Sequence, residues 1–74
     1  MHFTYVLKRE NGDWYVGYTA NLIARIKEHE VRWKSKVKLM YYEAYYSESL
    51  ARNREKRLKY YGSAWRGLKR RLSA

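Results

Sequence analysis

Five side chains of this sequence have types and spacing that could do chemistry together: Tyr5, Tyr15, Arg25, His29 and Glu55. A guanidinium matches a phosphate through two parallel hydrogen bonds, and a neutral imidazole can accept or relay a proton near neutral pH. A single carboxylate, here accompanied by two phenols, can hold a hard divalent cation. If the fold gathers these groups, the set suits chemistry on a phosphate ester.

The composition points to a polyanionic partner. Seventeen Lys plus Arg against seven Asp plus Glu give a formal charge of +10 over 74 residues. Such an excess attracts polyanions and speeds their association, and nucleic acid is the first partner to consider. Charge by itself predicts binding rather than catalysis, because a basic surface needs no reactive groups to hold a polyanion.

The length allows one domain, residues 1–74, which would bury roughly 60% of the surface that its unfolded chain exposes. Cys is absent, which excludes disulfides and thiolate metal sites. The apolar runs are too short for a membrane span, and residues 1–4 do not have the pattern of a signal peptide. We therefore expect a cytoplasmic protein with no membrane partner.

The pattern of apolar residues predicts three strands and three helices. In chain order, the expected elements are strands over 3–9 and 14–18, a helix near 20–31, a strand over 38–45, and helices near 49–61 and 64–72. The order β-β-α-β-α-α predicts an α+β fold, in which helices flank a three-stranded antiparallel sheet and bury their apolar faces on it.

Local signals set the expected ends and inward faces of the helices. The expected N-caps are Thr19 for the first helix, Ser47 or Ser49 for the second and Ser63 for the third, with Gly62 ending the second. The expected apolar stripes are Leu22, Ile23 and Ile26 on the first helix, and Leu50, Ala51, Leu58 and Tyr61 on the second.

Glu55 lies on or beside the apolar stripe of the second helix, four residues after Ala51 and three before Leu58. Burying an ionised carboxylate is costly unless a cation compensates it. One explanation is an ordinary ion pair with Arg52 or Lys59 at helical spacing, and the other is a metal ion. The wheel alone does not decide between them.

Arg25 and His29 stand four residues apart and therefore share one face of the first helix, at the edge of its apolar stripe. They could bind phosphate and relay a proton. Alternatively they form a plain helix edge, in which Arg25 pairs with Glu28 and His29 packs against Trp33.

The two phenols can share a site only if the first hairpin is irregular. A two-residue turn at Asn11-Gly12 would send Tyr5 and Tyr15 to opposite faces of the sheet, whereas a three-residue loop or a bulge within residues 10–13 brings them to one face. We therefore predict such a loop, with Gly12 in the left-handed conformation. The basic chain is also expected to supply the positive charge that a phenol needs in order to act as a base.

In this order the residues resemble the GIY-YIG nuclease domain, and most closely its small single-domain bacterial members. The resemblance rests on Phe3-Thr4-Tyr5, Tyr15-Val16-Gly17-Tyr18-Thr19, Arg25, His29 and Ala51-x-x-x-Glu55-x-x-Leu58-Lys59, and it spans nearly the whole chain. Two features depart from the family pattern. Phe3 and Thr4 replace the glycine and isoleucine of the first motif, and the C-terminal asparagine of some members has no counterpart.

The resemblance implies an endonuclease that uses one divalent ion, Mg²⁺ or Mn²⁺, held mainly by Glu55. It implies that Tyr5 is the general base toward water and that Arg25 stabilises charge on the phosphoryl group. It further implies that Tyr15 orients the phosphate or the water, and that His29 receives the proton of Tyr5. The expected partner is DNA, including branched or damaged structures, together with a protein that helps targeting.

Contacts to nucleic acid are expected from basic residues around the site. These are Arg32, Lys34, Lys36, Lys38, Lys59, Lys69, Arg70 and Arg71. Phosphate contacts carry little sequence information, so binding should depend steeply on salt and weakly on sequence. A solvated face is the alternative for each of these residues, and a non-catalytic nucleic-acid-binding module on the same scaffold is the alternative for the whole chain.

Overall fold

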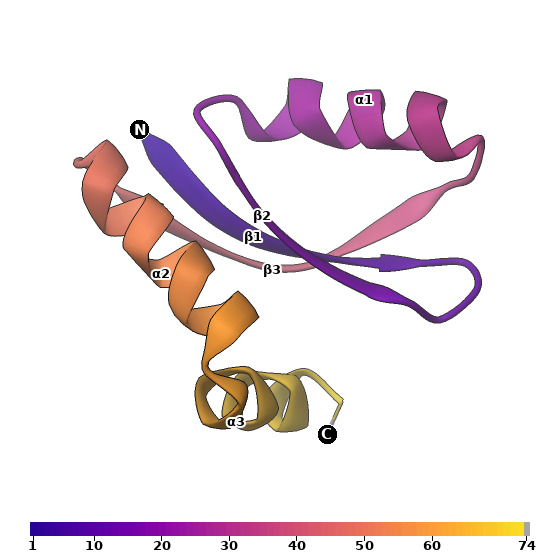
Figure 1. Ribbon diagram of the computed structural model, residues 1–74. Coiled ribbons are helices and arrows are strands. Elements are labelled where there is room, and N and C mark those ends of the chain that lie inside the picture. The colour runs from indigo at the N-terminus through magenta and orange to yellow at the C-terminus, as the bar shows by residue number, and fades with distance from the viewer. Residues whose placement is uncertain (74) are drawn as a thin grey trace.

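The computed structural model describes residues 1–73 and has the expected order of elements. Its bounds are β1 (His2–Arg9), β2 (Trp14–Thr19), α1 (Leu22–Trp33), β3 (Val37–Tyr45), α2 (Glu48–Tyr60) and α3 (Gly62–Leu72). The strands form one antiparallel sheet in the order β2-β1-β3. Helix α1 lies over one face of the sheet, and α2 and α3 lie on the other side (Figure 1). The predicted α+β fold is confirmed.

The apolar core lies between the sheet and the pair α2 and α3. Val6 and Val16, opposite each other on β1 and β2, pack with Leu58 of α2 and Leu68 of α3. Both strand residues follow the alternation of an antiparallel sheet, so their neighbours Tyr5 and Tyr15 point to the face under α1. The sheet therefore separates this core from the face that carries the two tyrosines.

Helix α2 is fixed to β1 at its first turns. Ala51 is fully buried, and the hydroxyl of the buried Thr4 donates a 2.6 Å hydrogen bond to its carbonyl oxygen. The small side chain permits this close approach. Since Glu55 follows Ala51 by one turn, the contact also sets where the carboxylate lies relative to β1.

The hairpin loop has the three-residue form that we predicted. Tyr5 pairs with Gly17 and Leu7 with Tyr15, and the backbone N–H of Arg9 donates to the carbonyl of Asp13 at 2.8 Å. Gly12 has a φ of +91°. The register puts Tyr5 and Tyr15 on the same face, because directly paired residues of an antiparallel ladder share a face.

Several local predictions were wrong. Asn21, not Thr19, caps α1 by accepting from the N–H of Ala24, while the Thr19 hydroxyl accepts from the N–H of Asn21. Helix α3 begins at Gly62 after Tyr61, with no side-chain cap from Ser63, so Gly62 starts a helix rather than following one. For the second helix Ser47 is the cap, as one of the two predicted alternatives.

The predicted apolar stripes of the helices also included residues that are exposed. Ile23 is exposed on α1, where His29 is the buried residue instead. On α2 only Ala51 and Leu58 are buried, whereas Leu50 is exposed, as is Tyr61 just after the helix. Each helix therefore buries a narrower face than its apolar residues suggested.

Replacing Gly12 by Ala should lower the free energy of unfolding by about 1–2 kcal/mol, because a Cβ disfavours the left-handed conformation. Urea unfolding measures this. Gly67→Ala is the matched control, since Gly67 lies inside α3 with open space around it and a negative φ. That change should stabilise the protein by roughly 0.5–1 kcal/mol. Equal effects of the two substitutions would contradict the loop argument.

Candidate active site

Gly17 makes room for the phenol of Tyr5. The two residues are direct partners across the β1–β2 ladder, and the ring of Tyr5 lies where a side chain of residue 17 would project. A Cβ on Gly17 would collide with the hydroxyl of Tyr5 and come within 2.9 Å of Cε2 of Tyr15. The ring centroids of the two tyrosines are 6.2 Å apart. A glycine inside a strand commonly marks such a close approach, and here it directs the Tyr5 hydroxyl over the edge strand β2.

His29 completes an aromatic cluster under α1. Its Nε2 lies 2.8 Å from the hydroxyl oxygen of the buried Tyr5, at hydrogen-bond distance. Its ring meets Tyr15 edge-to-face at 4.8 Å and stacks on Trp33 at 4.5 Å. The other ring nitrogen, Nδ1, is buried and has no hydrogen-bond partner within residues 1–73. The imidazole is thus held by packing, with the Tyr5 phenol as its polar contact.

The environment makes both partners of this hydrogen bond neutral at neutral pH. Burial lowers the pKa of His29, and the charges of Arg25 and Arg32 lower it further against the opposing charge of Glu28. Burial, and then Tyr15, raise the pKa of Tyr5 above its ordinary value, although Arg25 acts in the opposite direction. We had expected positive charge to lower the pKa of the phenol. That expectation was wrong, because desolvation outweighs the cation.

Arg25 lies near this cluster at the surface. It belongs to the same helix as His29, and its charge acts on the pKa of both His29 and Tyr5. Its Nε lies 3.4 Å from Glu28 in an exposed pair three residues apart. Exposed pairs of this kind are worth little, about 0–1 kcal/mol, so the guanidinium can leave Glu28 for a phosphate at small cost.

Glu55 reaches the cluster from α2, on the other side of β2. Its side chain is 19% exposed, and one carboxylate oxygen lies 3.1 Å from Nζ of Lys59. That ammonium lies 5.5 Å from the centre of the Tyr15 ring. The charge of Glu55 also raises the pKa of Tyr5, so the carboxylate and Arg25 act on one phenol. Through Lys59 the carboxylate is connected to Tyr15, whose ring packs against His29 on the helix that also carries Arg25.

A metal ion at Glu55 would have few ligands from the protein. Among residues 1–73 there is no group of three or more His, Asp or Glu side chains that could hold a metal ion together. Glu55 itself offers a hard oxygen donor that is partly open to solvent and compensated by a single ammonium. Mg²⁺ keeps several waters and accepts one or two carboxylates plus substrate oxygens, so this residue fits such an ion.

The other ion-pair and packing alternatives are present as well. Glu55 pairs with Lys59, Arg25 pairs with Glu28, and His29 stacks on Trp33. These contacts are compatible with the cluster, because His29 keeps its contact with Tyr5 and Glu55 is connected to Tyr15 through Lys59.

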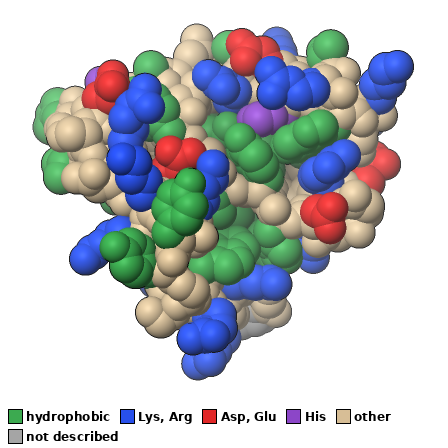
Figure 2. All heavy atoms as spheres, viewed as in Figure 1, with side chains coloured by type: hydrophobic (Ala, Val, Ile, Leu, Met, Phe, Trp, Pro, Cys, Tyr) green, Lys and Arg blue, Asp and Glu red, His purple; other side chains and the backbone are tan. Residues whose placement is uncertain are grey.

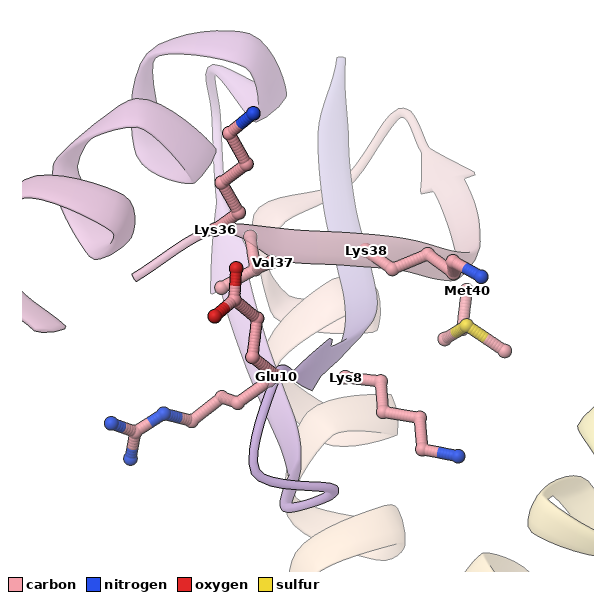
Figure 3. A pocket seen from close by; sticks show the side chains of 7 residues that line it. Lys8, Glu10, Lys36, Val37, Lys38 and Met40 are labelled. Carbon is pink, nitrogen blue, oxygen red and sulfur yellow. The ribbon is translucent and has the colours of Figure 1, made fainter. Parts of the chain in front are cut away.

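The predicted nucleic-acid contacts fall into three groups. Arg32 lies in the last turn of α1, and Lys34 is the C-cap residue of that helix. Lys36 precedes β3 and Lys38 lies at its start, and both line a groove with residues 8–10 (Figure 3). Lys59 belongs to the cluster itself, whereas Lys69, Arg70 and Arg71 end α3. Lys and Arg side chains surround a central group of hydrophobic side chains on the face seen in Figure 2.

Lys8 and Arg9 are basic residues that the sequence reasoning missed. Nζ of Lys8 lies 5.0 Å from the centre of the Trp14 ring, and the guanidinium of Arg9 lies 4.5 Å from that of Trp33. Strand alternation could have found them, since it puts Lys8 on the face of Val6 and Arg9 on the face of Tyr5.

Comparisons with known proteins identify the family of this chain. A family model described as the GIY-YIG catalytic domain matches residues 1–59. A UPF0213 protein of Halobacterium salinarum is 35% identical over 66 residues, covering 80% of this chain and 86% of the relative. A UPF0213 protein of Staphylococcus aureus is 33% identical over 67 residues, covering 81% and 82%. No solved structure gives a significant match.

The chain belongs to the GIY-YIG family of nuclease-type catalytic domains. The matched segment ends at residue 59, so it contains β1, β2, α1, β3 and nearly all of α2. It therefore includes each of the five clustered residues. Of the described elements, none is a helix long and apolar enough to cross a membrane.

Gly17→Ala should lower the free energy of unfolding by roughly 1–3 kcal/mol, because the added methyl collides with the two tyrosine rings. Urea unfolding measures the loss. Adding Tyr5→Phe removes the hydroxyl that takes part in the collision, so the effects of the two substitutions should be less than additive. Strict additivity would argue against the contact.

Proposed function

We propose that this protein is a divalent-metal-dependent endonuclease that hydrolyses phosphodiester bonds of DNA. The observation that carries the proposal is the 2.8 Å contact between the Tyr5 hydroxyl and the neutral His29, formed over Gly17 at a point where the charges of Arg25 and Glu55 both act. A basic phosphate-binding surface beside a proton acceptor and a carboxylate suits phosphoryl transfer to water.

Tyr5 is the general base in this proposal, and it works only together with His29. A phenol with a raised pKa cannot be a phenolate at neutral pH, so it can take a proton from water only as it gives its own proton away. His29 is uncharged, and its Nε2 lies in reach of that proton. The transfer moves one proton from water to the Tyr5 oxygen and one from Tyr5 to Nε2.

The remaining residues bind the phosphate. Arg25 exchanges Glu28 for the phosphoryl oxygens and stabilises the charge that develops there. Tyr15, held between His29 and Lys59, orients the phosphate or the water. Glu55 would hold Mg²⁺ or Mn²⁺, which supplies charge stabilisation to the phosphate oxygens.

Cleavage of DNA by the purified protein tests this proposal. Supercoiled plasmid and a branched duplex are incubated with Mg²⁺ or Mn²⁺, and matched reactions contain a chelator. We expect nicked or cut products only where the metal is free. Products that persist in chelator would rule out the metal requirement, and the absence of products from both substrates with either metal would rule out the enzyme.

The second candidate is a non-catalytic nucleic-acid-binding module. The ion pairs Glu55–Lys59 and Arg25–Glu28 favour it, because they satisfy the two charged groups without metal or phosphate. Titration with Mn²⁺, followed through its paramagnetic effect on solvent water, separates the candidates. An endonuclease should have a Mn²⁺ site that Glu55→Ala abolishes, whereas a binding module should hold DNA tightly with no such site.

A further inference from the structure

A shallow groove beside the Tyr5–His29 cluster combines aromatic walls with a basic rim. It has a volume of about 280 Å³, and we call it the tryptophan groove; its lining residues are Trp14, Tyr15, Val16, Leu58, Lys59 and Trp65. Tyr15 and Lys59 are shared with the candidate active site. The groove therefore begins at the position where the scissile phosphate would bind.

Two indoles give the groove flat apolar surfaces. Trp14 and Trp65 meet edge-to-face with their ring centres 5.7 Å apart and an interplanar angle of 74°. Both are only partly buried, although they pack against the core. Val16 and Leu58 close the floor. The volume is just below the roughly 300 Å³ at which sites for whole small molecules begin, so the groove suits one flat ring of a larger ligand.

Lysines lie over two of the aromatic rings at the groove. Lys8 and Lys69 extend over the ring of Trp14 at 5.0 and 5.8 Å, and Lys59 extends over Tyr15 at 5.5 Å. We call Lys8, Lys59 and Lys69 the rim lysines. Among residues 1–73, no acidic side chain lines the groove. Of the three, only Lys59 has a carboxylate partner within residues 1–73.

The basic surface continues from Lys8 onto β3. Lys8 and Lys38 are direct partners across the β1–β3 ladder, and their side chains extend in the same direction near Met40 (Figure 3). Like charges directly opposite each other destabilise a sheet. A bound phosphate would turn this repulsion into two favourable contacts.

We propose that the tryptophan groove binds an unpaired nucleotide of the nucleic-acid substrate, with its base against the indoles and its flanking phosphates on the rim lysines. Aromatic platforms combined with cations are the chemistry of single-strand binding, because every base has a face that can stack. A paired base cannot enter, since its faces are covered by its neighbours. The proposal rests on the proposed function for the identity of the substrate, and it assigns that substrate an unpaired segment next to the cut.

Binding is measured in chelator, so that no cleavage interferes. The probes are a short oligothymidylate, a blunt duplex of the same length, and polyglutamate as a protein-like polyanion. We expect the oligothymidylate to quench tryptophan fluorescence and to bind more tightly than the other two. Trp65→Leu keeps an apolar side chain at the groove and should weaken this binding about fivefold or more, because it removes a stacking surface.

Two matched double variants test the role of the rim lysines. Lys8→Gln/Lys69→Gln should lower the slope of log K against log salt by about 1.4, at ~0.7 per phosphate contact of a single strand. Lys27→Gln/Lys56→Gln removes the same charge at exposed positions away from the groove and should leave the slope unchanged. Equal changes in the two variants, equal affinity for duplex, or displacement by polyglutamate would each overturn the proposal.

The outcome is separable from that of the proposed function. If the protein binds oligothymidylate through the groove but cuts no DNA, the nuclease fails and the groove stands. If it cuts DNA while Trp65→Leu binds and cuts like the wild type, the groove fails and the nuclease stands. Circular dichroism of each variant confirms that the fold is retained.

Discussion

Replacing Glu55 by Ala should reduce the rate of DNA cleavage by about a thousandfold or more. In the proposed site this carboxylate is the protein's one ligand to the divalent ion, and metal stabilisation of the transition state is worth several kcal/mol, of which about 4 corresponds to a factor of 10³. The loss should appear in kcat/KM with both Mg²⁺ and Mn²⁺, measured by gel on plasmid DNA.

The fold should survive this change, because the Glu55–Lys59 pair contributes at most about 1 kcal/mol with Lys59 as exposed as it is. Glu48→Ala is the matched control. Glu48 lies on the same helix and forms the same kind of pair, 2.9 Å from Arg52, on an exposed surface. It should cut like the wild type. Similar rates for the Glu48 and Glu55 variants would sink the metal-ligand assignment.

The form of the first hairpin could be predicted once the two tyrosines were required to share a site. Strand alternation and the parity of the loop then demand a three-residue loop or a bulge, and both are properties of the backbone. The register Tyr5 to Gly17 and the positive φ of Gly12 follow from it. The element order was equally accessible, because each element carries its own apolar pattern.

Helix starts and exposed apolar residues were less accessible. Thr19 and Asn21 are both good caps, and the choice fell to Asn21 because the Thr19 hydroxyl bonds the N–H of Asn21 in a local turn. Ile23 is exposed because α1 turns His29 and Trp33 toward the sheet instead. The capping residue and the buried face of α1 depend on how this helix packs on the sheet, and a local sequence pattern does not specify that packing.

The chemistry of the site depended on burial that the sequence does not state. The charge of +10 suggested a phenol with a lowered pKa, whereas burial of Tyr5 under α1 raises it. The sequence also left the partner of Glu55 open, since either Lys59 or a metal ion could compensate its charge. In the structure Lys59 lies at this carboxylate. The net charge of the chain changes the pKa of a phenol from a distance and is screened by salt, whereas desolvation acts on the hydroxyl itself.

Tyr5→Phe should lower the cleavage rate by about 10²–10⁴, the usual contribution of a general base. The variant keeps the ring over Gly17 and removes the hydroxyl that contacts His29. It also leaves Nε2 of a buried imidazole without a partner, which should cost about 1–3 kcal/mol of stability. Rates are therefore compared at a temperature at which circular dichroism shows both proteins to be folded.

Tyr18→Phe is the matched control for this variant. Tyr18 also contacts a histidine through its hydroxyl, 2.9 Å from Nδ1 of His2, on the face of β2 opposite to Tyr15 and Gly17. The substitution thus removes a phenol–imidazole contact of the same kind outside the site. Its cleavage rate should stay near that of the wild type.

The pH dependence of cleavage distinguishes a proton relay from a packing role of the phenol. His29 has a lowered pKa, so it stays neutral and able to accept a proton down to about pH 6.5, and the rate should fall only below that value. The free energy of unfolding should change with pH in the same direction. As the pH falls, His29 is protonated in the unfolded chain before it is protonated in the folded one, so stability rises with pH up to about 6.5 and is flat above.

On the alkaline side, the raised pKa of Tyr5 predicts no loss of rate from its ionisation below about pH 10. In Tyr5→Phe the acid limb assigned to His29 should vanish from the residual rate of the folded protein, because no phenol proton remains to be received. A residual rate that keeps the wild-type acid limb would show that His29 acts without Tyr5. The hydrogen bond between Tyr5 and His29 would then stabilise the fold without relaying the proton.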